Sequence, residues 1–222
     1  MRRNLTPGKV GIDFLDGFIH GAINDALAKD GIDTSGLYQF YAVRVQKRLG
    51  GLSEYEEHIA RYAIERCAGR RVVEIGTGLG ELPIVLALNG MTTAGVEYDG
   101  NRQRAAMALH ERIASCFPEI LERYEFIRGS FPETLSGSAW TGADVTLLFT
   151  NVGAGWDADR TGRAIDFFTN VGEIILDLRL FGVVREDAAD REELFARIAA
   201  RARTAELLPD LSPGCYFARF TF

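Results

Sequence analysis

The pattern of apolar and polar positions changes near residue 70. Before that point, apolar residues recur at helical spacing, which predicts helices over residues 10–28, 37–49 and 53–67. After it, short apolar runs alternate with helical patterns, as in a domain of strands and helices. We therefore expect an N-terminal helical cap over residues 1–52 and an α/β domain over residues 53–222.

The second part of the chain predicts a mostly parallel sheet. The expected strands are 72–75, 93–98, 124–127, 144–149, 173–178, 205–208 and 216–222, and the expected helices are 81–89, 101–116, 159–169 and 190–203. Parallel neighbours need a crossover connection, so this alternation places helices on both faces of the sheet. The last two strands are separated by a turn-rich segment, 209–214, which predicts an antiparallel pair that closes a seven-stranded sheet.

Composition excludes several classes of protein. With 222 residues, 47% of them hydrophobic and 25% charged, the chain can bury a full core and is no disordered tail. Its longest apolar run, Leu82 to Leu88, is far shorter than the roughly twenty residues of a membrane span. We expect no membrane segment and no signal peptide.

The charged residues and the cysteines limit the class of binding partner and the cellular compartment that we expect. A net charge of −6 and an isoelectric point near 5.2 disfavour sequence-independent binding to the phosphate backbone of nucleic acid. Cys67, Cys116 and Cys215 show neither metal-ligand nor redox spacing, so we expect reduced thiols, no metal and a cytoplasmic location.

The most informative segment is an apolar strand that ends in a glycine loop and leads into a helix, residues 72–80. Glycines after a parallel strand let a ligand approach the backbone at the carboxyl edge of the sheet. A dinucleotide loop needs its third glycine where this chain has Glu81, and no lysine of a phosphate-binding loop follows. Glu74, just ahead of the glycines, instead suits a ligand with positive charge.

These residues resemble the first motif of the class I S-adenosylmethionine-dependent methyltransferases, an acidic residue followed by Gly-x-Gly-x-Gly. Glu97 ends the next expected strand, where that family binds the ribose hydroxyls, and Ser130 stands where the family usually has an aspartate near adenine. The resemblance implies a three-layer Rossmann-like fold and S-adenosylmethionine as cofactor. The implied cofactor contacts are Glu74, Gly76, Thr77, Gly78, Gly80, Glu97, Tyr98, Ser130 and Phe131.

The fourth expected strand ends at Asn151, where the acceptor normally meets the methyl group, and Asn151 is the candidate catalytic residue. Residues 151–156 lack the paired prolines of enzymes that methylate bases or amides, which disfavours those substrates. Residues 97–181 are also somewhat similar to non-SET histone-lysine methyltransferases and their bacterial relatives. If this resemblance holds, Trp156 and Phe181 line the methyl-transfer channel. The alternative is that both are aromatic residues that pack in the core or at its rim.

Methyl transfer is an in-line displacement on an activated donor, so a catalytic base is optional. His58 borders the apolar face of its expected helix beside Glu54, and His20 and His110 lie on expected helices without a clear partner. We expect all three to be surface or satisfied histidines. An aromatic cluster within residues 38–41 indicates either a lid that selects the substrate or a helical layer packed on the sheet.

The sequence thus predicts a methyltransferase that acts on a small molecule, with no nucleic acid or membrane partner. A protein lysine substrate is one alternative, and a non-catalytic interaction module of the same fold is another. An aminopropyl transferase is disfavoured, because Thr150 and Asn151 stand where such enzymes usually carry paired aspartates.

Overall fold

The structure is a computed structural model that describes Gly21 and residues 54–150, 158–168, 170–179, 188–212, 214 and 216–222. Several predictions lie outside these residues: the helical cap and lid apart from Gly21, the candidate catalytic Asn151, and the side chains of His20, Trp156, Phe181 and Cys215. The part of the chain that the structure describes holds the sheet, its flanking helices and the glycine loop.

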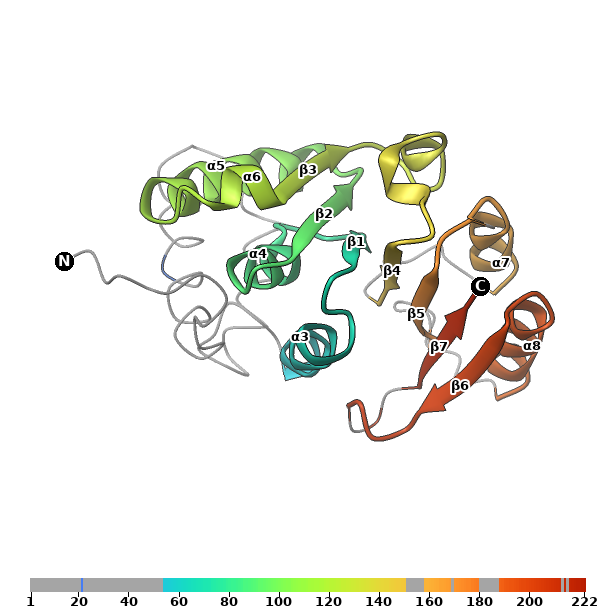
Figure 1. Ribbon diagram of the computed structural model, residues 1–222. Helices are drawn as coiled ribbons and strands as arrows, with labels where there is room; N and C mark the ends of the chain where they lie inside the picture. The colour runs from blue at the N-terminus through green and yellow to red at the C-terminus, as the bar shows by residue number, and fades with distance from the viewer. Residues whose placement is uncertain are drawn as a thin grey trace.

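One seven-stranded sheet runs through the described part (Figure 1). Its strands are β1 (Arg71–Ile75), β2 (Thr92–Glu97), β3 (Tyr124–Arg128), β4 (Val145–Phe149), β5 (Glu173–Asp177), β6 (Thr204–Leu208) and β7 (Phe217–Thr221). They lie in the order β3-β2-β1-β4-β5-β7-β6. Strands β1 to β5 pair in parallel, and β7 is antiparallel to both of its neighbours. The predicted mostly parallel sheet with an antiparallel C-terminal strand is confirmed.

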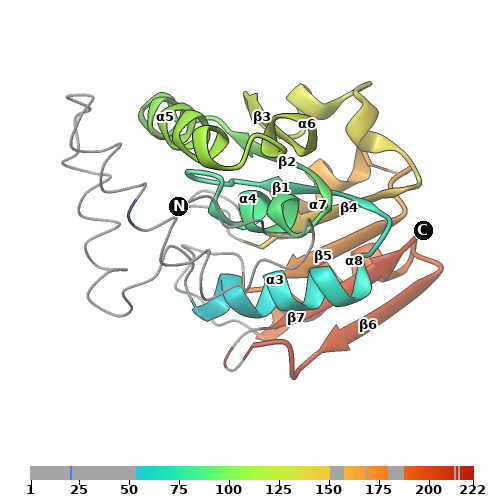
Figure 2. The same ribbon diagram turned by 60° about the vertical axis from the view of Figure 1, so that its left-hand side comes forward.

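Helices cover both faces of the sheet, as Figures 1 and 2 show. They are α3 (Glu54–Arg66), α4 (Glu81–Leu88), α5 (Gly100–Cys116), α6 (Ile120–Arg123), α7 (Ala158–Asp166) and α8 (Ala188–Ala199). Val72 of β1 packs in the core with α3, α4 and α5, while Val73 and Ile75 pack in the core with α7 and α8. Strands buried on both faces in this way are rich in Val, Ile and Leu, and β1 contributes Val72, Val73 and Ile75.

The connection between β3 and β4 differs from the other connections between successive parallel strands, because it holds no α-helix. Two short 3-10 turns, Glu133–Leu135 and Ala139–Thr141, occupy it, and α6 precedes β3. None of these three was predicted. Pro132 and Gly137 interrupt this segment, and both residues disfavour a continuous helix.

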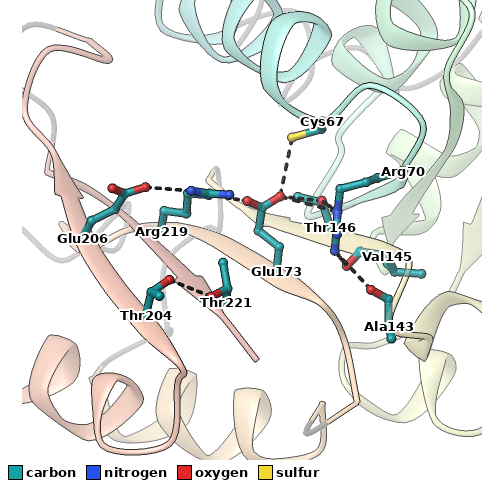
Figure 3. Close-up of polar contacts among 10 residues, drawn as sticks. All are labelled: Cys67, Arg70, Ala143, Val145, Thr146, Glu173, Thr204, Glu206, Arg219 and Thr221. Atoms are coloured by element: carbon teal, nitrogen blue, oxygen red, sulfur yellow. Dashed lines mark hydrogen bonds and ion pairs between the residues drawn. The ribbon is translucent and has the colours of Figure 1, made fainter.

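A polar network crosses the α3 face of the sheet near the amino-terminal ends of the parallel strands (Figure 3). Its centre is Glu173 of β5, whose side chain is 4% exposed and pairs with Arg219. Glu173 also accepts hydrogen bonds from Thr146 Oγ1 at 2.7 Å and from the Cys67 thiol at 3.6 Å. We call these residues, together with Arg70 and Glu206, the Glu173 network.

Both cysteines of the described residues are free thiols, Cys67 buried and Cys116 exposed. Burial, and next the neighbouring Glu173 carboxylate, raises the pKa of the Cys67 thiol to about 12. Among the helices that the structure describes, none combines the length and the apolar character required to cross a bilayer.

Candidate functional site

The predicted glycine loop joins the end of β1 to the start of α4. Gly76, Gly78 and Gly80 have φ angles of 72°, 64° and 85°, a conformation that side chains with a Cβ rarely adopt. The backbone N–H groups of Gly76 and Thr77 both donate to the carbonyl of Val96, at 2.9 and 3.0 Å. The loop is thereby fixed against the carboxyl end of β2.

Glu97, the last residue of β2, connects the two predicted motifs. Its carboxylate is 1% exposed and accepts the N–H of Gly78 on Oε2 at 3.0 Å. Oε1 accepts the N–H groups of Tyr98 at 3.0 Å and Asp99 at 2.9 Å. The guanidinium of Arg102 lies 3.8 Å from Oε2. Three backbone donors therefore hold the carboxylate in place beside the glycine loop.

Glu74 lies under the loop. It is 2% exposed and accepts a hydrogen bond from Thr77 Oγ1 at 2.7 Å. Thr77 in turn packs on Gly95 of β2, where a Cβ would lie 2.6 Å from Thr77 Oγ1. Gly95 was missed as a supporting residue, although a glycine inside a strand is a signal of close approach.

Tyr124, the first residue of β3, supports the loop from the core and was also missed. A Cβ on Gly80 would lie 2.2 Å from the Tyr124 hydroxyl. That hydroxyl is buried, and no hydrogen-bond partner for it is found within the described ranges. Burial, and then the Glu74 and Glu81 carboxylates, raises the pKa of Tyr124 well above its usual value. No sequence pattern could reveal this contact, because it depends on how far a β3 side chain reaches beneath α4.

The other predicted cofactor residues are in different environments. Tyr98 follows Glu97 and is 72% exposed, so its ring is accessible to a ligand. Ser130 is exposed in the loop after β3, which is tied to β2 by a 3.0 Å bond from the Gly129 N–H to the Glu97 carbonyl. Phe131 is buried, and its ring stacks on Phe168 at 4.9 Å with the planes 10° apart. Its side chain belongs to the core, which leaves its backbone for any contact with a ligand.

The two described histidines have partners of different kinds. His58 Nδ1 lies 3.0 Å from Ser212 Oγ in the loop after β6. The His110 ring meets Tyr124 edge to face, with centroids 5.2 Å apart. Its Nε2 is buried, and within the described residues it has no hydrogen-bond partner.

Because Nε2 of the His110 ring is buried, we expect the folded chain to be less stable in mild acid. Burial lowers its pKa below the usual 6.5, so the unfolded chain binds its proton before the folded chain does. The free energy of unfolding should therefore decrease as pH falls below about 6.5, by at most ~1.4 kcal/mol per pH unit for this one proton. Urea unfolding between pH 7.5 and 5.5 should show a smaller decrease in His110→Gln than in the wild type. His58→Gln is the control, and equal pH dependence in wild type and His110→Gln would contradict the assignment.

Within the described residues, no group of three His, Cys, Asp or Glu side chains is placed to hold a metal ion. The polar groups at the loop are instead backbone N–H groups and the carboxylates of Glu74 and Glu97.

Solved structures share this fold. A Klebsiella pneumoniae protein named as an O-methyltransferase matches 96% of this chain and 91% of its own, at 14% identity and a TM-score of 0.57. Cofactor-bound Rv0187 from MTB matches 99% of this chain and 98% of its own, at 19% identity and a TM-score of 0.54. The methyltransferase domain of bacterial CtHen1-C matches 75% and 96%, at 14% identity and a TM-score of 0.55. The chain has the class I methyltransferase fold.

The class I methyltransferase fold accounts for the strand order and for the position of the glycine loop after β1. No protein-family model matches the chain, and no curated protein matches it either. The three neighbours above do not include a named histone methyltransferase, so that weaker resemblance stays a prediction.

Proposed function

We propose that the chain transfers a methyl group from S-adenosylmethionine to an oxygen atom of a small molecule. The observation that carries this proposal is the contact between the two predicted motifs, in which Gly78 donates to the buried Glu97 carboxylate. It joins a backbone surface without Cβ atoms to a fixed negative charge at the carboxyl edge of a parallel sheet, where this type of fold binds ligands.

The chemistry of these residues fits S-adenosylmethionine. A carboxylate offers about four acceptor positions, and three on Glu97 are taken by backbone N–H groups. Oε2 accepts one of the three, so it has room for a ribose hydroxyl. The buried carboxylates of Glu74 and Glu97 favour a cation over a phosphate, and the bare glycine backbone permits close approach of the ligand.

When bound, S-adenosylmethionine supplies a methyl group already activated by its sulfonium. The chain's own contribution is then to hold and orient the donor. The glycine loop positions it against the backbone, Glu97 holds the ribose, and the exposed ring of Tyr98 covers one side. Asn151 is predicted to line the part of the site where the acceptor molecule meets the methyl group.

The substrate class follows from two arguments. Two neighbours, from Klebsiella pneumoniae and from Nostoc punctiforme, are named as O-methyltransferases. The chain is also acidic overall, which favours a small molecule over a nucleic acid. A protein lysine substrate and a non-catalytic module remain the competing functions that experiment must separate.

A binding titration tests the cofactor. Calorimetry should show saturable binding of S-adenosylmethionine and of S-adenosylhomocysteine. Glu97→Gln should weaken both by about 10- to 100-fold, because it loses a charge-assisted hydrogen bond worth ~1.5–3 kcal/mol. Glu122→Gln, an exposed carboxylate on α6, is the matched control and should bind as the wild type does. Absence of binding in the wild type would support the module instead.

A labelling experiment tests the acceptor. The chain is incubated with a cell extract and S-adenosylmethionine that carries an isotope-labelled methyl group. Labelled small molecules whose mass-spectrometric fragmentation places the methyl group on oxygen support the proposal. Label in protein lysines would replace it with the protein-directed alternative.

A further inference from the structure

A cavity lies between the loop after β3 and helix α7. Its volume is about 780 Å³, within the range of ~300–1,000 Å³ typical of small-molecule sites. Ser130, Glu133 and Thr134 line one wall, and Arg160, Arg163 and Phe167 line the other. Arg160 and Arg163 fall on one face of α7 because they are three positions apart, and Phe167 follows directly after the helix ends at Asp166.

Two arginines, Arg160 and Arg163, line the α7 side of the cavity, although the whole chain carries a net charge of −6. Asp159 of α7 pairs with Arg163 and also with Arg197 of α8, at 3.2 Å. Asp166 pairs with Arg197 at 2.9 Å and with Arg201. Arg163 therefore shares its partner Asp159 with Arg197.

Arg163 can turn from Asp159 to a ligand at little cost. Both side chains of this pair are 62% exposed, and ion pairs so exposed contribute ~0–1 kcal/mol. Asp159 would keep Arg197 as its partner. A guanidinium group matches a carboxylate in shape and can donate two parallel hydrogen bonds to it.

The other residues that line the cavity further limit which chemical groups the ligand can carry. Phe167 is 66% exposed, so its ring offers apolar surface beside the two guanidinium groups. Ser130 and Thr134 line the opposite wall, and a hydroxyl group is a donor that an anion can use. Glu133, also on that wall, disfavours a second negative charge.

We propose that this cavity binds a small aromatic molecule with a single carboxylate. Arg160 and Arg163 hold the carboxylate, and the Phe167 ring contacts the aromatic ring. The site adjoins the glycine-loop region through Ser130 but uses none of the residues that fix Glu97. The cavity shares Ser130 and Phe131 with the predicted cofactor contacts, so binding of the carboxylate and binding of the cofactor must be measured separately.

Calorimetry on the full chain with 4-hydroxybenzoate tests the site. The probe should bind saturably, and the neutral 4-hydroxybenzamide should bind at least tenfold more weakly, since it cannot form the charge-assisted bonds. Phthalate, with two carboxylates, should also bind more weakly because of Glu133. Equal affinity for the acid and the amide, or no saturable binding of the acid, would overturn the proposal.

Variants locate the site. Arg160→Gln and Arg163→Gln should each weaken 4-hydroxybenzoate binding about fivefold or more. Arg66→Gln, an exposed arginine at the end of α3, should leave it unchanged. Saturating S-adenosylhomocysteine should not displace the probe. Displacement, or full affinity in the double variant Arg160→Gln/Arg163→Gln, would place the probe elsewhere and refute the assignment.

Discussion

Replacing Gly80 by alanine should destabilise the chain by about 3 kcal/mol and weaken cofactor binding at least ~tenfold. The new Cβ would lie 2.2 Å from the Tyr124 hydroxyl, and Gly80 has a φ of +85° that alanine adopts with strain. Since Tyr124 is buried, the loop must move instead. Urea unfolding and calorimetry with S-adenosylhomocysteine measure the two effects.

Gly69→Ala is the control for the backbone strain alone. Gly69 has a φ of +80°, but a Cβ there meets nothing within 4 Å. It should therefore lose only the ~1–2 kcal/mol that a left-handed alanine costs, with cofactor affinity unchanged.

Removing the Tyr124 hydroxyl tests the steric part. In the double variant Gly80→Ala/Tyr124→Phe, the nearest ring atom to the new Cβ is Cζ at 3.1 Å, a tight but tolerable contact. This variant should recover about half of the lost free energy of unfolding and part of the affinity. If Tyr124→Phe brings no recovery, Tyr124 is not what holds the loop in place.

Glu173→Gln should lower the free energy of unfolding by about 2–3 kcal/mol. Removing one partner of a buried ion pair typically costs ~3–5 kcal/mol, and the expected loss is smaller here because Arg219 and Arg70 are each about one-third exposed. The amide cannot satisfy both guanidinium groups as the carboxylate does. Urea unfolding at pH 7 measures the loss.

Glu206→Gln provides the matched comparison at the outer end of the Glu173 network. Its side chain is 52% exposed and bonds Arg219 at 2.9 Å, so its loss should cost less than ~1 kcal/mol. The Glu173 network lies near the amino-terminal ends of the parallel strands, away from the glycine loop, so folded Glu173→Gln should keep its cofactor affinity. Equal losses in the two variants would show that burial of Glu173 contributes nothing.

The fold was largely readable from the sequence because its signals are local. Every described strand and each longer helix coincides with a predicted element to within a few residues, and the antiparallel placement of β7 was anticipated. A short, mostly apolar run such as β4 is the local signal of a strand buried on both faces, and it can be recognised without knowing what packs on it. The short turns between β3 and β4 lack such a signal, which is why they were missed.

The candidate site was predictable only in its backbone. Glycines at 76, 78 and 80 adopt the conformation that only glycine adopts readily, and Glu97 meets the loop. Which way a side chain points depends on packing between distant segments. The buried ring of Phe131 and the hydroxyl of Tyr124 beneath Gly80 are such cases, and a sequence pattern does not encode them.

The position of β7 has a consequence for biosynthesis. β6 lies at the edge of the described sheet and reaches the parallel strands only through β7, which comes later in the chain. As the chain leaves the ribosome, β6 therefore appears before the strand that must separate it from β5. β6 therefore cannot join the sheet until β7 has been made, and until then the edge of β5 is open to pairing with other nascent chains.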